Sequence, residues 1–241
     1  MKELLTRALF GKLENRLLKK YEEKYPHMKP SFSQEGEDIL LERIFSSLTN
    51  GFYVDVGAHH PQRFSNTYKF YLKGWTGINI EPTPGGIDPF LTYRPRDINL
   101  SMGISDSSGP LKFYVFKEGA LNTFSEETVQ KLIKTTDYRP SLTIDVPMKR
   151  LDEVLETHLP KISAKNTKIT FMTIDTEGFE MPVLKSNDWT RFCPSVILIE
   201  DRDFDLLNPM NSEVHRFLAE KEYLLFAKTH NTLFYRQRGW K

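Results

Sequence analysis

Several features that mark other classes of protein are scarce in this sequence. The 241 residues include one cysteine, Cys193, so no disulfide can form within the chain and a reducing compartment is expected. The net charge is +1, and nothing in the composition points to nucleic-acid binding. No apolar run reaches the ~20 residues that span a bilayer, and the N-terminus lacks a signal-peptide pattern. We therefore expect a soluble cytoplasmic protein.

The first 25 residues are predicted to form a basic amphipathic helix. Leucines recur every four residues from Leu5 to Leu17, and lysine and arginine occupy the other face. Such a helix packs on its own domain or on a second subunit of an oligomer. Attachment to the surface of an anionic membrane is the alternative. With a proline-containing linker, the helix makes an extension over residues 1–30, ahead of one domain over residues 31–241.

Strand and helix patterns alternate from residue 52 onward, which is typical of a parallel sheet with helices on both faces. The apolar strand candidates are 52–56, 77–81, 98–104, 169–175 and 195–200. The helical stretches are 31–49, 64–73, 150–157, 178–187 and 211–222. Two further strands, 223–228 and 232–236, are expected to pair as an antiparallel hairpin. The predicted fold is a single doubly wound α/β domain around a seven-stranded mixed sheet.

The segment 117–149 is the least regular part of the sequence. It follows a strand candidate at 111–116 and contains one short predicted helix, from about 125 to 133. A long connection inside a compact α/β domain often serves as a lid or a substrate-binding loop, and a surface excursion without a role is the alternative. Within it, Lys131, Lys134 and Arg139 either hold an anionic acceptor or form a solvated face.

Polar residues follow the first two strand candidates where a ligand would bind. The stretch "FYVDVGAHHP" places Asp55 at the end of a buried strand and a turn of small residues, Gly57 and Ala58, directly after it. Glu81 ends the second strand. Ligands of open α/β sheets bind outside the carboxyl ends of the strands, where small residues let a ligand approach the backbone and an acid reaches ribose hydroxyls. This pattern predicts a nucleotide-like ligand.

The charge of this turn favours a methyl donor over a dinucleotide. The sequence has no G-x-G-x-x-G, because His59 and Pro61 stand where a dinucleotide-binding turn carries further glycines. Asp55 would repel a pyrophosphate but suits a cation, such as the ammonium or sulfonium group of S-adenosylmethionine. An NAD-dependent oxidoreductase is therefore the disfavoured alternative.

Several motifs, taken in order, resemble the FkbM-type methyltransferases, a family of class I S-adenosylmethionine-dependent enzymes with a Rossmann-like fold. They are "SQEGEDILL", "FYVDVGAHHPQRFSNT", "GWTGINIEPTP", "INLSMGISDSSGPLKFYVF" and "TIDTEGFEMPVLKS". The resemblance covers about residues 31 to 201. It implies an O-methyltransferase acting on hydroxyls of glycans, polyketides or other small molecules, often in surface-polysaccharide biosynthesis.

The resemblance also implies which residues bind the cofactor. The turn after the first strand would hold the methionine part, the acid ending the second strand would bind the ribose, and an acid at the end of the third strand would meet the adenine. Asp97 competes for this last role but stands at the strand's start. Gln34, Glu37 and Asp38 of "SQEGED" would close over the cofactor, with helix capping as the alternative, since Ser33 with Glu37 resembles a loose capping box. The implied cofactor residues are Gln34, Asp55, Gly57, Ala58, Glu81 and Asp106.

Methyl transfer to a hydroxyl needs alignment and a base that takes the proton. The fourth strand candidate runs into "TIDTEGFE", so Asp175 and Glu177 are expected at the carboxyl edge of the sheet and are the first choice for the base. Two acids so close repel each other, which raises a pKa toward neutrality. His60, in the first loop, is the third catalytic candidate, because imidazole has a suitable pKa. The alternative for Asp175 is capping of the next helix.

Two other interpretations remain open from the residues alone. Asp175, Glu200 and Asp201 end neighbouring strands and would suit Mg²⁺, which lowers the pKa of an acceptor hydroxyl. Nothing in the pattern requires a metal, and none is expected. A non-catalytic interaction module that keeps the fold is the other alternative, but it has no need of the complete acid and glycine set.

Overall fold

The structure is a computed structural model that covers most of the chain. The described residues are 13, 16–17, 19–21, 23–107, 109–159 and 168–240. Most of the helix predicted over residues 1–25 lies outside them. The described leucines of that stretch, Leu13 and Leu17, are in a helix and are 53% and 59% exposed. In the described part of the chain, no helix combines the length and the apolar character that crossing a membrane requires.

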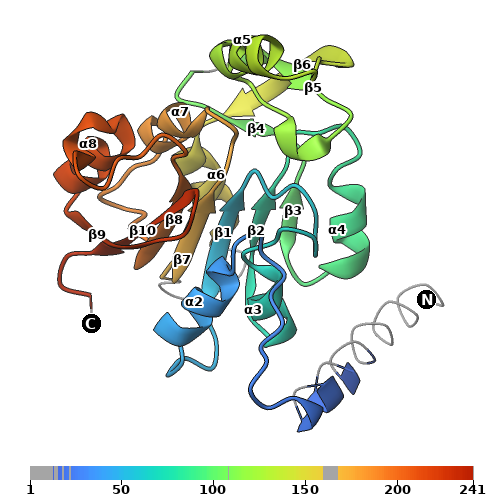
Figure 1. Ribbon diagram of the computed structural model, residues 1–241, viewed down its shortest axis with the longest axis vertical. Helices are drawn as coiled ribbons and strands as arrows, with labels where there is room; N and C mark the ends of the chain where they lie inside the picture. The colour runs from blue at the N-terminus through green and yellow to red at the C-terminus, as the bar shows by residue number, and fades with distance from the viewer. Residues whose placement is uncertain are drawn as a thin grey trace.

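A seven-stranded mixed sheet forms the centre of the molecule (Figure 1). Its strands, in spatial order, are β3 (Ile98–Leu100), β2 (Thr76–Ile80), β1 (Phe52–Val56), β7 (Phe171–Ile174), β8 (Val196–Glu200), β10 (Thr232–Gln237) and β9 (Tyr223–Lys228). The first five are parallel, and β10 runs antiparallel between β8 and β9. This arrangement confirms the predicted sheet and its closing hairpin, and the strand order reverses beside β1.

Helices cover both faces of this sheet, as predicted. One face carries α2 (Glu37–Ile44) and α3 (Tyr68–Leu72), and α4 (Asp88–Tyr93) lies beside β3 at the sheet edge (Figure 1). The opposite face carries α6 (Leu151–His158), α7 (Glu180–Lys185) and α8 (Glu213–Glu220). A one-turn helix, η3 (Pro209–Asn211), precedes α8.

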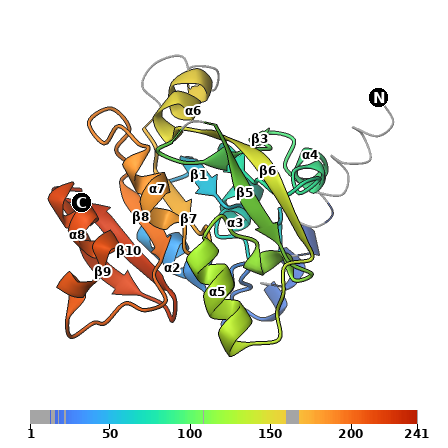
Figure 2. The same cartoon turned by 90° about the horizontal axis from the view of Figure 1, so that it is seen from above.

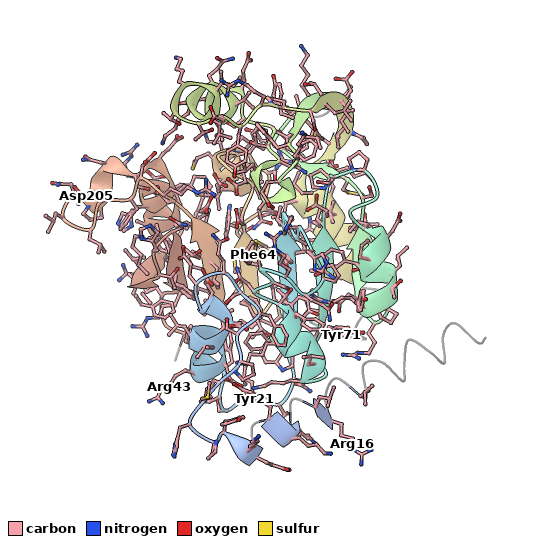
Figure 3. All side chains as sticks on the ribbon, turned by 45° about the vertical axis from the view of Figure 1, so that its right-hand side comes forward. Arg16, Tyr21, Arg43, Phe64, Tyr71 and Asp205 are labelled. Atoms are coloured by element: carbon pink, nitrogen blue, oxygen red, sulfur yellow. The ribbon has the colours of Figure 1, made fainter. Side chains whose placement is uncertain are left out.

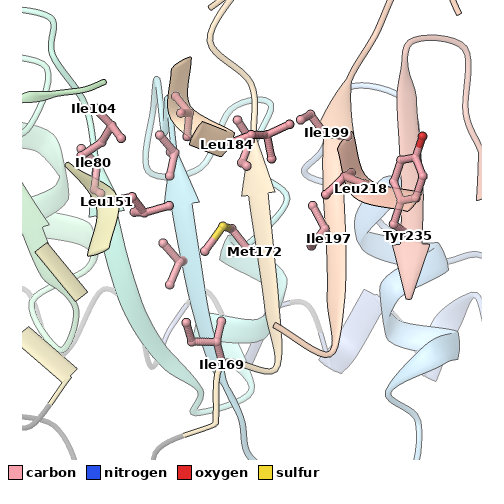
Figure 4. Close-up of a cluster of buried hydrophobic side chains, with 14 of the residues drawn as sticks. Ile80, Ile104, Leu151, Ile169, Met172, Leu184, Ile197, Ile199, Leu218 and Tyr235 are labelled. Atoms are coloured by element: carbon pink, nitrogen blue, oxygen red, sulfur yellow. The ribbon is translucent and has the colours of Figure 1, made fainter. Parts of the chain in front are cut away.

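Two apolar cores hold the layers together. On the side of α6, α7 and α8, apolar side chains of the parallel strands pack against apolar side chains of the helices. Figure 4 shows Met172 of β7 with Leu151 of α6 and Leu184 of α7 in this core. The other core is aromatic and includes Phe45, Phe171 and Trp75, which is 2% exposed. All residues of β1 and β8 are buried, which explains why these strands read as continuous apolar runs.

A second sheet lies across the carboxyl ends of the parallel strands (Figures 1 and 2). Its strands, in spatial order, are β4 (Gly103–Ile104), β6 (Leu142–Lys149) and β5 (Gly109–Val115). The one-turn helix η1 (Gly119–Leu121) and α5 (Glu126–Thr135) complete this upper layer. The segment 117–149, for which a surface excursion was the alternative, is therefore part of a folded layer above the sheet edge, and α5 confirms its one predicted helix.

The second sheet differs from the predicted strand pattern in two ways. The strand expected over 98–104 is wrong, because β3 ends at Leu100 and the chain then leaves the main sheet to enter β4. Strand β6 was not predicted. Only Val146 and Met148 are buried along it, so its sequence lacks the apolar run of a core strand, and it is held by pairing with β5.

Candidate active site

A pocket lies between the carboxyl edge of the seven-stranded sheet and the upper layer. It contains roughly 870 Å³ of empty space, open solvent at its mouth included. The strand ends contribute Asp55, Glu81 and Asp175 to its floor, and η1 contributes Gly119 and Ala120. The structure therefore brings together the acids that the sequence placed at three different strand ends.

Gly57 sits where two strand ends nearly touch. Its φ of 81° lies in the left-handed region, and a Cβ built there would come within 1.8 Å of the backbone oxygen of Asp175. The amides of Gly57 and Ala58 both donate to the Ile80 carbonyl at 3.0 Å. No helix begins at this turn: the chain continues as a loop to α3, and both amides are already used within the protein.

Asp55 and Glu81 are buried acids with defined partners. Thr67 Oγ1 donates to Asp55 Oδ2 at 2.7 Å, and the backbone amides of His59 and Thr83 donate to the two Glu81 carboxylate oxygens at 2.8 Å. Burial raises the pKa of Asp55 to about 6, although the Thr67 hydrogen bond and the nearby Arg94 charge oppose the rise. At neutral pH the floor of the pocket therefore carries negative charge suited to a cation.

The two adjacent imidazoles take different positions. His60 does not line the pocket, and its Nδ1 accepts hydrogen bonds from the amides of Gln62 and Arg63 at 3.1 and 2.9 Å. This local turn explains its orientation, and the geometry does not support His60 as the base. His59 lines the pocket instead, at a φ of 53°. Burial lowers the pKa of His59, so its imidazole is neutral at pH 7.

Asp175 presents a carboxylate to the pocket directly after β7. Its side chain is exposed there, and among the described residues no hydrogen bond to its carboxylate is formed. Enclosure by the surrounding protein raises its pKa well above the usual range, and the charges of Glu200 and Glu177 add to the rise. Because water enters the open pocket, this effect is largest when a ligand fills it.

Glu177 and Glu200 share one arginine. Arg202 Nη2 lies 2.8 Å from a carboxylate oxygen of Glu177, and its Nε lies 3.0 Å from Glu200 Oε1. Burial raises the pKa of Glu177 to about 8, and the charge of Glu200 adds to the rise. Glu177 therefore belongs to an ion-pair cluster, while Asp175 keeps an unpaired carboxylate.

The magnesium alternative named a different set of acids. Ligand oxygens of Asp175, Glu177 and Glu200 lie within 4.8 Å of one another, but Asp201 turns away and accepts a hydrogen bond from Ser212 Oγ at 2.6 Å. Arg202 already supplies a positive charge to this cluster. The acids that the structure brings together are therefore Asp175, Glu177 and Glu200, and not the set that the sequence offered.

Most of the "SQEGED" block proves to be structural, with one exception. The Glu37 carboxylate accepts from the Glu35 amide at 2.8 Å, and Asp38 accepts from the Phe32 amide at 2.8 Å. Both acids are buried and fix the chain that leads into α2, whose N-cap position is Gly36 without a side-chain cap. Gln34 is exposed and lines the pocket, so the structure places it where the sequence predicted.

Comparisons with known proteins address the resemblance noted above. The family model described as the methyltransferase FkbM domain matches residues 55–225. The chain belongs to the FkbM methyltransferase domain family. A solved structure to which the chain is similar is the methyltransferase FkbM from Methylobacillus flagellatus KT, at 17% identity and a TM-score of 0.45. That alignment covers 78% of this chain and 44% of the other, so this chain spans less than half of that relative. No curated protein matches this chain.

The FkbM match begins at Asp55 and therefore includes Gly57, Glu81 and Asp175. It confirms the family predicted from the sequence. The seven-stranded mixed sheet with helices on both faces agrees with the predicted fold class. Gln34 lies outside the matched range, and its cofactor role stays a prediction.

In this FkbM domain the apolar end of the pocket was missed from the sequence. Phe124 packs between Phe113 and Phe179, with ring centroids 4.5 and 5.4 Å away, and all three line the pocket with Met102. No local sequence pattern identifies these residues as pocket residues, because they come from three separate segments: β5, the loop before α5 and the loop before α7. Only the folding of the upper layer over the sheet brings them together.

Asp106 is the predicted cofactor residue that the structure moves away. It was placed at the end of a third strand extending to residue 104, but that strand ends at Leu100. Asp106 is exposed beyond β4 and does not line the pocket. Asp97, its rival, is buried and accepts from Tyr53 and Asn79, which is a structural role at the other end of the sheet. The structure therefore does not support Asp106 as the residue that contacts the adenine.

Proposed function

We propose that this protein is an S-adenosylmethionine-dependent O-methyltransferase acting on a hydroxyl of a sugar, a glycan precursor or a related metabolite, in the cytoplasm. The observation that carries the proposal is the juxtaposition in one pocket of Asp55, Glu81 and the unpaired Asp175. Membership of the FkbM methyltransferase family supports it. The acceptor class rests on the resemblance of the sequence to that family.

The residues of the pocket fit this cofactor. Asp55 offers a buried carboxylate to an ammonium or sulfonium, and Gly57 lets the first turn pack against the end of β7, where any Cβ would collide with the Asp175 carbonyl. Glu81 has lone pairs left for ribose hydroxyls beyond the two amides it accepts from. Phe113, Phe124 and Met102 give an apolar slot for adenine. Bound S-adenosylmethionine would supply an electrophilic methyl group to an acceptor hydroxyl.

The chain's own contribution to the reaction is positioning and proton removal. Asp175 is the residue best placed to accept the hydroxyl proton, since its carboxylate faces the pocket without a partner and its raised pKa makes it a stronger base than an ordinary aspartate. Glu177 remains held by Arg202 and shapes the potential around Asp175. A positioned base contributes about 10²–10⁴ in rate.

A matched pair of substitutions tests this assignment. Asp175→Asn should lower kcat at least about 100-fold and leave binding of S-adenosylhomocysteine, measured by calorimetry, nearly unchanged. Asp106→Asn makes the same chemical change outside the pocket and should alter neither quantity. Unchanged turnover in Asp175→Asn contradicts the base assignment. Binding of NAD in place of S-adenosylhomocysteine would favour the oxidoreductase alternative.

A further inference from the structure

A second depression adjoins the donor pocket and plays no part in the function proposed so far. This groove contains roughly 1210 Å³ of space, open water at its mouth included. One wall is α5, through Thr128 and Thr135, and the other is the segment from Glu200 to Val214. Asp205 belongs to the lining, and Figure 3 shows the loop that carries it at the outer edge of the molecule.

The groove meets the donor pocket at Glu177, which lines both. The turn after Glu177 is in contact with α5, because a Cβ on Gly178 would come within 2.2 Å of Thr128 Oγ1. Thr123 Oγ1 also donates to the Glu177 carbonyl at 2.8 Å. The two cavities therefore meet at a turn that is held in place by α5 and its approach, and Asp175 lies two residues before Glu177 in the donor pocket.

The lining of the groove is strongly acidic. It carries seven aspartate and glutamate side chains against two cations, Lys131 and Arg202. Both cations are already paired: Lys131 Nζ lies 3.0 Å from Asp203, and Arg202 lies between Glu177 and Glu200. Even with Glu177 and Glu200 protonated, the acids outnumber the cations.

We propose that this groove receives the methyl acceptor and that its acidic lining selects uncharged or cationic polyhydroxyl acceptors over anionic ones such as sugar phosphates. This inference rests on the proposed function. Carboxylates accept hydrogen bonds from sugar hydroxyls and ammonium groups, whereas like charge across a cleft is repelled. Lys131, which the sequence offered as a ligand for an anionic acceptor, is instead held by Asp203.

The test compares three related probes on the full chain saturated with S-adenosylhomocysteine. Binding of glucosamine, glucose and glucose 6-phosphate is measured by saturation-transfer NMR. The phosphate should bind at least tenfold more weakly than glucose, and glucosamine at least as tightly. Raising the salt from about 0.1 M to about 1 M shortens the screening length from ~10 to ~3 Å and should narrow the difference.

Two charge-reversing variants place the effect in the groove. Asp203→Lys should reduce the discrimination against glucose 6-phosphate at least threefold. Glu220→Lys makes the same charge change at the end of α8, outside the groove lining, and should leave it unchanged. Equal binding of phosphate and glucose, or binding of none of the three to the loaded protein, overturns the inference. Failure of S-adenosylhomocysteine itself to bind would instead overturn the proposed function.

Discussion

At the scale of single residues, the pocket holds its acids and its backbone under constraint. Among the described residues, four residues other than glycine have a positive φ. Three of them, His59, Phe64 and Glu177, line the pocket. Such conformations cost about 1–3 kcal/mol each and persist where the surrounding structure fixes them. Burial of Asp55 is a further constraint on the folded chain.

Asp55 makes donor binding dependent on pH. Its pKa is raised to about 6, so affinity for S-adenosylmethionine should fall as the pH drops through about 6, where the carboxylate takes up a proton. Glu81, Asp97 and Arg94 also act on this carboxylate, and protonation of His59 would weaken cation binding in the same direction. Calorimetry between pH 5 and pH 8 measures the dependence.

The Asp55→Asn variant separates these contributions. It should bind the donor at least tenfold more weakly and with a flatter pH profile, whereas His59→Gln should keep the step near pH 6. Because a raised acid pKa means that stability is lost as pH rises from about 4 to 6, Asp55 costs on the order of 2–3 kcal/mol at pH 8. Asp55→Asn without ligand should therefore be at least as stable there, and a marked loss would contradict this account.

Residues at strand ends were predictable, and residues of the covering layer were not. Asp55, Glu81 and Asp175 each follow a buried apolar run, so their position at the carboxyl edge follows from the period of the sequence. Phe124 and Asn122 enter the pocket only because the upper layer folds over it. Asn122 Nδ2 donates to Thr83 Oγ1 at 3.0 Å, a contact between distant segments that no local pattern announces.

At the scale of elements, one buried arginine joins α4 to β1 and the first loop. Arg94 is fully buried, and its guanidinium donates to Asp97 Oδ2 at 2.9 Å, to Tyr53 Oη at 2.9 Å and to Thr67 Oγ1 at 3.0 Å. Thr67 in turn donates to Asp55. The arginine therefore holds the loop that supports the donor carboxylate, and its ring neighbours include Tyr71, labelled in Figure 3.

Removing this arginine should destabilise the fold, because it leaves the buried Asp97 carboxylate without its cationic partner. Arg94→Met should lower the free energy of unfolding by about 3–5 kcal/mol, measured by urea denaturation. Adding Asp97→Asn should recover part of that loss. Arg96→Met is the control, since Arg96 is exposed, and it should cost below about 1 kcal/mol. A loss in Arg94→Met no greater than in the control would show that the cluster carries little of the stability.

The elements that the sequence predicted are those with a core face. Helices α6, α7 and α8 follow apolar stripes that pack on the sheet, and their predicted ranges contain or overlap the observed ones. Strand β6 and the short α4 were missed, because β6 is exposed along most of its length and α4 buries only Phe90. Such elements form through partners distant in sequence, which a local pattern does not contain.

At the scale of the whole molecule, the donor pocket lies at the boundary of two layers. Its floor belongs to the seven-stranded sheet and its roof to η1, β5 and the segment that leads into α5. Figures 1 and 2 show β5 and α5 in the layer above the carboxyl edge of that sheet. A ligand that contacts both layers stabilises the folded chain by an amount that grows with the logarithm of its affinity, because the unfolded chain has neither surface. Binding should therefore be visible in the stability of the entire domain.

Thermal unfolding measures this coupling directly. At 100 times its Kd, S-adenosylhomocysteine adds about 2.7 kcal/mol to the stability. For a chain of this length that corresponds to a rise in Tm of about 5–10 °C.

NAD at the same concentration should leave Tm within about 1 °C of its value without ligand, because the turn at Gly57 lacks the glycines and amide donors that hold a pyrophosphate. Asp55→Asn, binding at least tenfold more weakly, should lose at least about half of the rise with S-adenosylhomocysteine, while Asp106→Asn keeps it. An equal rise with NAD would mean that the pocket recognises the adenosine that both ligands share, with the acids of its floor contributing nothing to the choice.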